Sequence, residues 1–249
     1  MAGSERFDMG RLVRRTVAVL GRNLGLFALA SLLLSGLPAV LLDLTKSGLG
    51  LTGEAARVAD LLGSVVSVAT GAFLDGALIS ATISDLNGRK LTFGQMMSAA
   101  SSAWLPLVGV SLLYGSGVVL GLILLVVPGL LLLTMWAVTS PVAAVERTGV
   151  YAAFHRSAEL TRDHRWAIFG LYAATGLAIL LLAFTVAVPL TLFQHAGSGP
   201  LPPHAHELGS AVVSVALNML TAVFSACLYH ELRTDKEGGA PRAVADVFA

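Results

Sequence analysis

The amino-acid sequence predicts an all-α, polytopic membrane protein with six transmembrane helices and three short cytoplasmic interfacial amphipathic helices. Of its 249 residues, 55% are hydrophobic and only 12% are charged, against roughly 25% charged in soluble domains. The mean hydropathy is +0.79, and the apolar residues gather in long runs, as in integral membrane proteins. With 16 Lys and Arg against 15 Asp and Glu, no overall field attracts nucleic acid.

The N-terminal segment, residues 1–23, is predicted to form an amphipathic helix on the membrane surface. Apolar residues recur at helical spacing from Leu12 to Leu24, and Arg11, Arg15 and Arg22 fall on the opposite face. We expect these arginines to face headgroup phosphates. A nucleic-acid-binding arm is the alternative, and the apolar stripe argues against it. The segment lacks the early apolar core of a cleavable signal.

Six apolar runs are predicted to cross the bilayer within a transmembrane domain at residues 24–232. A bilayer core about 30 Å thick requires roughly 20 apolar residues per helix. The runs lack Lys and Arg and cover approximately residues 24–42, 59–84, 104–127, 129–145, 166–193 and 208–229.

The third and fourth runs are separated only by Val127-Pro128-Gly129. Proline disfavours a helical residue before it and glycine permits a reversal, so we expect a tight hairpin turn here. One kinked helix is the alternative, but it would be far longer than the bilayer is thick.

The positions of the basic residues predict the orientation. All Lys and Arg residues except Lys46 and Arg57 fall on one side of the six-span arrangement. By the positive-inside rule both termini are cytoplasmic, and residues 233–249 form a cytoplasmic tail.

Each odd-numbered span follows a short amphipathic segment, which gives three units of interfacial helix plus hairpin. In the second unit Thr92 and Gln95 have capping-box spacing. The third covers residues 150–161, and Trp104 and Trp166 open the following spans at the expected headgroup level. Duplication and shared physical demands explain this pattern equally well.

Small residues in the spans are interpreted as helix-packing positions. Gly117 and Gly121 form a GxxxG pair, and Gly63, Ser67 and Gly71 form a small-residue ladder. Such residues let membrane helices approach closely.

Several short motifs occur in a fixed order in the second half of the chain. They are Pro128-Gly129, Pro141-Val142 with Glu146, Ala153-Phe154-His155-Arg156-Ser157 with Leu160-Thr161, and Leu228-Tyr229-His230-Glu231-Leu232-Arg233.

Over roughly residues 60–237 this order resembles the YciC-like bacterial inner-membrane proteins. It is also similar to the membrane domain attached to some glycerophosphodiester phosphodiesterases. Asp163 and Glu231 depart from the family, which commonly has Gly and Asp there. The resemblance implies a multi-pass protein of the bacterial inner membrane and no particular activity, and the phosphodiesterase barrel is absent.

No enzymatic constellation is evident, and we expect no catalytic residues and no cofactor. The spans hold no His to serve as base for their serines, and the phosphate-loop and dinucleotide-binding glycine patterns are missing. The single cysteine, Cys227, excludes an intrachain disulfide. One external loop carries zinc-binding residue types, but its Gly and Pro content favours a solvated loop without metal; these residues are His195, His204, His206 and Glu207.

A cytoplasmic cluster of arginines is the first candidate site. Basic groups beside a bilayer gain about 1 kcal/mol each from anionic lipid. The cluster is therefore a candidate dock for anionic lipid headgroups or a membrane protein partner, and a plain topology determinant is the alternative. Its residues are Arg147, Arg156, Arg162 and Arg165, with Ser157 inside the family-like motif.

Asp75 is the second candidate, because it is the ionisable residue placed well inside a predicted span. A charged carboxylate at that depth is costly and requires a partner. Ser67, Thr70 and Asn218 are candidate partners by depth. Asp75 either ties helices together or recognises a cation or polar solute.

The sequence thus predicts a non-catalytic integral membrane protein that acts as a scaffold or through lipid or partner contacts. A small-solute or ion transporter with a polar path near Asp75 is the alternative. A membrane-embedded lipid enzyme ranks third, because no constellation of carboxylates, histidines or metal ligands supports it.

Overall fold

The computed structural model describes residues 8–124, 126–195 and 205–237, which form helices and short turns without any strand. Among the described residues, five helical segments are long and apolar enough to cross a membrane. The all-α class is confirmed, with several apolar helices that could span a membrane. The elements are α1 (Met9–Ser31), the π-helix η1 (Leu32–Gly36), α2 (Leu37–Gly48), α3 (Gly53–Leu86), α4 (Phe93–Leu124), α5 (Val126–Met135), α6 (Thr139–Glu146), α7 (Val150–Thr161), α8 (Arg165–His195) and α9 (Ala205–Glu237).

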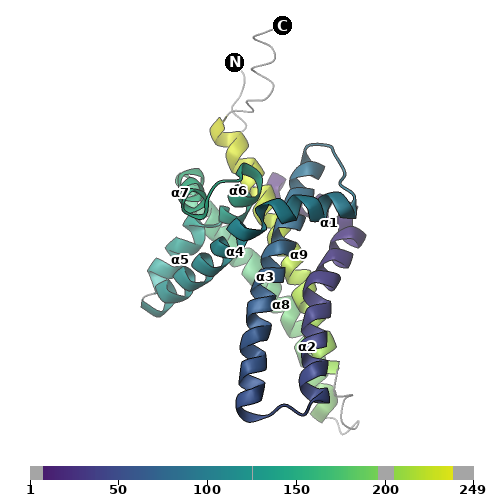
Figure 1. Ribbon diagram of the computed structural model, residues 1–249. Coiled ribbons are helices and arrows are strands. Elements are labelled where there is room, and N and C mark those ends of the chain that lie inside the picture. Colours follow the sequence, from purple (N-terminus) through teal and green to yellow (C-terminus); the bar gives the residue numbers. More distant parts are fainter. Residues whose placement is uncertain (1–7, 125, 196–204, 238–249) are drawn as a thin grey trace.

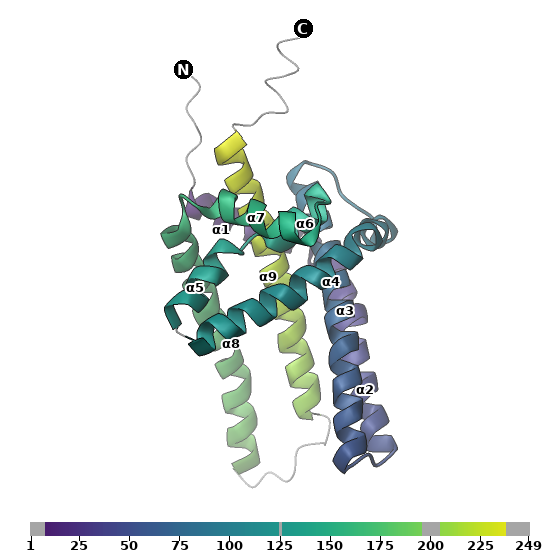
Figure 2. The same cartoon turned by 60° about the vertical axis from the view of Figure 1, so that its left-hand side comes forward.

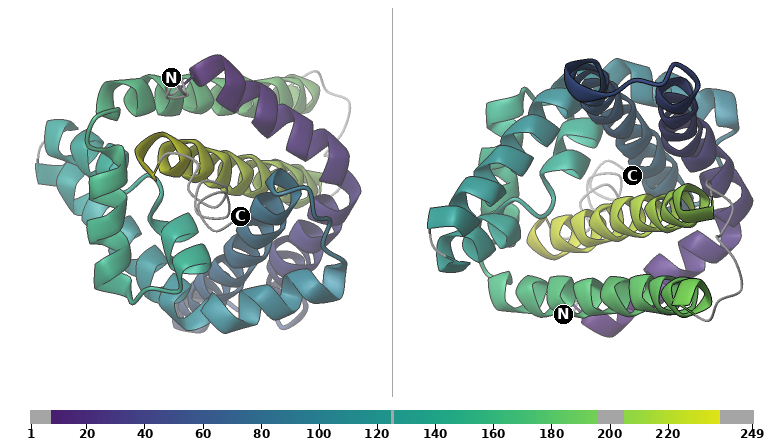
Figure 3. Two further views of the ribbon diagram at one scale, coloured as in Figure 1. Left: turned by 90° about the horizontal axis from the view of Figure 1, so that it is seen from above. Right: turned by 90° about the horizontal axis from the view of Figure 1, so that it is seen from below.

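Helices α2, α3, α8 and α9 run lengthwise beside one another, and α6 and α7 lie across one end of the molecule (Figure 1). The end views place α9 between α8 and α3, and α9 packs against both (Figure 3). The hairpin of α4 and α5 runs obliquely to the long helices (Figure 2). The predicted fifth span lies within α8, although many of its side chains fall outside the described part of the chain.

The N-terminal helix begins with a side-chain cap. Oδ1 of Asp8 accepts hydrogen bonds from the backbone N–H groups of Gly10 (2.8 Å) and Arg11 (3.3 Å). Both hydrogen bonds lower the pKa of the Asp8 carboxyl, and the bond from Arg11 has the larger effect. The elements α1, η1 and α2 form one helical run that continues through the predicted boundary near residue 23.

The arginines of α1 do not face away from the protein as predicted. Arg11 and Arg15 pair with Glu231 of α9, and Arg22 pairs with Asp85 of α3 at 2.5 Å. Leu12, next to Arg11 in the same helix, is fully buried. The polar stripe of α1 therefore packs on the protein, because carboxylates of neighbouring helices meet it there.

The second interfacial segment and the third predicted span form one helix, α4, without a break at Trp104. Its capping box is confirmed: the Gln95 side chain accepts from the Thr92 N–H at 2.9 Å, and the Gln95 N–H donates to the Thr92 hydroxyl at 3.4 Å. The indole of Trp104 donates to the carbonyl of Ala69 in α3 at 2.9 Å. Ala69 lies in the middle of α3, so Trp104 lies against the middle of that helix.

The predicted reversal after α4 is confirmed, because α5 packs back on α4, and the single kinked helix is wrong. The predicted turn residues Val127-Pro128-Gly129 lie inside α5, so the reversal comes before them. The helices approach so closely that a Cβ on Gly121 would lie 2.9 Å from Cα of Gly129. A Cβ on Gly117 would lie 2.5 Å from the Trp136 ring. The GxxxG pair therefore packs α4 against α5 and the residues after it, as predicted.

The second small-residue ladder packs at one of its three positions. A Cβ on Gly63 would meet the Leu42 side chain of α2, whereas a Cβ on Gly71 would meet nothing within 4 Å. Ser67 is exposed.

Candidate functional site

The fourth predicted span is broken at Trp136–Val138, between α5 and α6. Hydroxyl groups of α7 and α8 bind the freed backbone groups. Oγ of Ser157 donates to the Met135 carbonyl at 2.9 Å and accepts from the Val138 N–H at 3.3 Å. The hydroxyl of Tyr172 donates to the Ala137 carbonyl at 3.1 Å. Irregular backbone within an apolar stretch is tolerated when protein groups satisfy it in this way.

This arrangement gives Ser157 a structural position. Its side chain is fully buried, and its hydroxyl is both donor and acceptor at the break. The sequence placed Ser157 with the arginines as a binding residue, but its side chain is not available to a headgroup. The two residues of the motif Arg156-Ser157 therefore point to different sides of α7, and only Ser157 binds the helix break.

Asp75 of α3 lies beside the same break. The side chain of Ser140, in the first turn of α6, is the hydrogen-bonding neighbour of its carboxyl. The predicted partners bind elsewhere: Thr70 donates to its own helix, and Asn218 donates to Ser35 at 3.2 Å. Asp75 thus links α3 to α6 at a helix start, where a carboxylate is favoured by the helix dipole.

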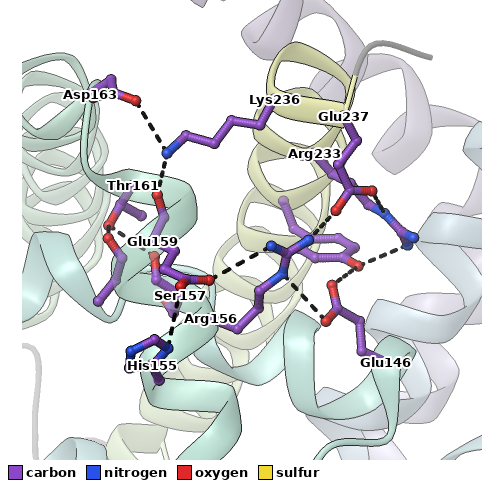
Figure 4. A network of polar contacts seen from close by, with 12 residues as sticks. Glu146, His155, Arg156, Ser157, Glu159, Thr161, Asp163, Arg233, Lys236 and Glu237 are labelled. Atoms are coloured by element: carbon purple, nitrogen blue, oxygen red, sulfur yellow. Dashed lines mark hydrogen bonds and ion pairs between the residues drawn. The ribbon is translucent and has the colours of Figure 1, made fainter. Parts of the chain in front are cut away.

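A polar network joins α6, α7 and the end of α9 (Figure 4). Glu146 accepts from the Tyr229 hydroxyl at 2.8 Å, and Arg233 donates to the same hydroxyl at 3.1 Å. Nε of Arg233 donates to Glu237 at 2.8 Å. Lys236 pairs with Asp163 at 3.2 Å and so lowers the pKa of the Asp163 carboxyl.

Arg156 is at the centre of this network and is surrounded by carboxylates. Its guanidinium lies 3.6 Å from Glu146 and 3.8 Å from Glu159, and it also binds Glu237. A guanidinium with three acidic neighbours has little charge left to offer an anionic headgroup. Arg156 therefore holds α7 against α6 and α9.

The other predicted arginines lie outside the network. Arg147 and Arg162 are exposed and form no ion pair with any residue that the structure describes, whereas Arg165 is half-buried. Arg147 ends α6 in a left-handed conformation, with φ of 51°. The four arginines therefore do not form one cluster.

The two ends of α7 repeat the same pair of exposed residues. Arg147 is followed four residues later by Tyr151, which is 86% exposed, and Arg162 is followed four residues later by Trp166, which is 87% exposed. We call these four residues the α7 rim.

The sequence interpretation missed the buried carboxylate of Glu231. It is 2% exposed and lies 3.2 Å from Arg11 and 2.5 Å from Arg15. A usable signal was present: Glu231 follows Cys227 and Leu228 by four and three residues, so it lies on the packed face of α9.

No group of three or more His, Cys, Asp or Glu side chains that could hold a metal is found among the described residues. The predicted external-loop residues are not tested by this, because their side chains fall outside that part of the chain. They are His195, His204, His206 and Glu207.

A family model described as a domain of unknown function, DUF7847, matches residues 90–232. The chain belongs to this family. The match begins just before α4 and includes the helix break, α7 and the buried Glu231. No curated protein and no solved structure matches the chain.

Proposed function

We propose that this DUF7847 protein is a non-catalytic protein of the bacterial inner membrane that binds anionic lipid headgroups through the α7 rim. The observation that carries the proposal is the repeated exposed Arg and aromatic pair at both ends of α7. Exposed arginines attract headgroup phosphates, and exposed Tyr and Trp favour the interfacial layer. The resemblance to YciC-like proteins supports the same membrane.

In this proposal the α6–α7 end of the molecule faces the cytoplasm. The excess of Lys and Arg on that side supports the orientation, with both termini cytoplasmic. The network around Arg156 holds α7 in place, so the rim presents its arginines at a fixed spacing. A membrane protein partner with acidic side chains is the alternative occupant of the rim.

The test is anionic-lipid binding by the full-length protein with Arg147→Gln and Arg162→Gln combined. Two arginines at about 1 kcal/mol each make binding of phosphatidylglycerol roughly 30-fold weaker. Thermal stabilisation by phosphatidylglycerol against phosphatidylcholine measures the effect. Arg57→Gln is the matched control, since Arg57 is 75% exposed near the α2–α3 connection. Unchanged lipid binding in the double variant would contradict the proposal.

A partner-binding role predicts a different result. Crosslinking in native membranes would then capture one protein partner in stoichiometric amount through the rim. The double variant would no longer bind this partner but would still be stabilised by phosphatidylglycerol.

Transport of a small solute or ion is the second candidate function, favoured by the position of Asp75 beside a broken helix. Transporters place ligand sites at such breaks. Asp75→Asn keeps hydrogen-bonding capacity and removes the charge, whereas Asp75→Leu removes both. Flux into proteoliposomes that is lost in Asp75→Asn at unchanged thermal stability supports transport; a silent Asn variant with an unstable Leu variant assigns Asp75 to structure.

A further inference from the structure

The connection between α4 and α5 has a composition unlike that of a water-exposed turn. From Gly117 to Leu133 there is no polar side chain. Ile123 and Leu124 at the end of α4 are 75% and 76% exposed, and Val127 in α5 is 67% exposed. A contiguous, exposed apolar surface of this kind requires an apolar environment.

The path of α4 keeps this turn near one end of the molecule. Up to Leu107, α4 packs on α3, where a Cβ on Gly76 would lie 2.6 Å from the Leu107 side chain. Beyond it, a Cβ on Gly109 would lie 2.8 Å from Val150 in the first turn of α7. Helix α7 lies across one end of the molecule. Because α4 contacts α7 there, α4 runs along that end and does not follow α3 to the opposite end.

The ribbon views agree with these contacts. The α4–α5 hairpin ends well short of the far ends of α2, α3 and α8 (Figures 1 and 2). Both ends of the hairpin segment return to the α6–α7 side, where Arg89 and Lys90 precede it and Arg147 follows it. The distribution of basic residues is the same for a hairpin that crosses twice and for one that does not cross.

We propose that the α4–α5 hairpin is a re-entrant wedge whose apolar tip lies among the acyl chains of one leaflet. The wedge enters and leaves the bilayer on the α6–α7 side, so it replaces two of the six predicted spans. Lipid acyl chains surround the tip, because its exposed residues are aliphatic and uncharged. Helical hairpins of this kind satisfy their backbone groups internally and are tolerated at membrane depth. The proposal is independent of the headgroup role of the α7 rim.

The experiment places an environment-sensitive fluorophore on Ile123→Cys in the full-length protein. Leu49→Cys, between α2 and α3 and 68% exposed, and Lys90→Cys, before α4, are the matched controls. The wild-type chain gives the background, because its one cysteine, Cys227, is fully buried. Proteoliposomes carry nitroxide lipids labelled either near the headgroup or near the chain end.

The expected result is loss of Ile123 fluorescence with the chain-end nitroxide and no labelling of Ile123→Cys by a charged thiol reagent from either side. Leu49→Cys and Lys90→Cys should be labelled from opposite sides. Labelling of Ile123→Cys from the Leu49 side would overturn the proposal and restore a spanning hairpin. Resistance to both nitroxides, with Ile123 crosslinking between chains, would overturn it in favour of a protein-covered tip.

Discussion

The α2–α3 and α4–α5 hairpins are both built from apolar helices but differ in the residues around their connections. Around the α2–α3 connection, the end of α2 carries Lys46 and the first turns of α3 carry Glu54, Arg57 and Asp60, with Lys46 and Asp60 paired at 2.7 Å. The α4–α5 connection carries only aliphatic residues, Pro and Gly. Charged side chains must reach water, so in the proposed arrangement the first connection lies at the far surface of the membrane domain. The second has no such requirement, and its depth is set by the helices around it.

The two hairpins also differ in how their helices touch. Backbone atoms of Gly121 and Gly129 set the approach of α4 to α5, whereas the flexible side chain of Leu42 lies against Gly63 between α2 and α3. Close backbone contact leaves no room for relaxation, but a leucine side chain can change rotamer. The contact between α4 and α5 can therefore adjust less than the contact between α2 and α3.

The largest effect that separates the hairpins is expected from one added charge at each turn. Leu124→Lys places an ammonium at the α4–α5 tip, and in lipid it should lower the free energy of unfolding by about 2.5–3.5 kcal/mol. Leu49→Lys, at a similarly exposed residue of the other turn, should change it by less than about 0.5 kcal/mol. Denaturant unfolding in bicelles measures both. Equal effects would show that the two turns share one environment.

A smaller effect is expected from filling the glycine contacts. Gly129→Ala puts a Cβ 2.7 Å from the backbone N of Leu122, and such overpacking costs about 1–3 kcal/mol. Gly63→Ala should cost less, because Leu42 can move. Gly115→Ala is the control: it meets nothing within 4 Å and should stabilise α4 by up to about 1 kcal/mol. Thermal unfolding in detergent ranks the three variants, and a Gly63→Ala cost above that of Gly129→Ala would reverse the comparison.

The smallest effect is expected at the ion pair of the α2–α3 connection. Lys46→Gln removes the pair with Asp60, whose side chain is 60% exposed, and exposed pairs contribute about 0–1 kcal/mol. The loss should vanish in high salt, because the charges are screened. Thermal unfolding at low and high ionic strength measures it. A cost that persists in high salt would mean that the pair is shielded from water and that the connection is not at the far surface.

Features that depend on neighbouring residues in the chain were predicted from the sequence. The helical membrane class, the Thr92–Gln95 capping box, the reversal near Pro128 and the packing role of Gly117 and Gly121 all follow from local hydropathy, backbone preference or side-chain size. Each of these is decided within a few residues of chain, so the sequence is sufficient.

Features that depend on partners distant in sequence were decided by the tertiary structure. Arg11 and Arg15 form a helical stripe in either case, but only the packing of α1 on α9 turns them toward Glu231. Asp75 needed a partner, and only the break after α5 places Ser140 beside it. The sequence shows that a charged side chain requires a polar partner. Which residue is that partner, and how deep an apolar hairpin lies, depends on helices that are far apart in the sequence and packed together in the fold.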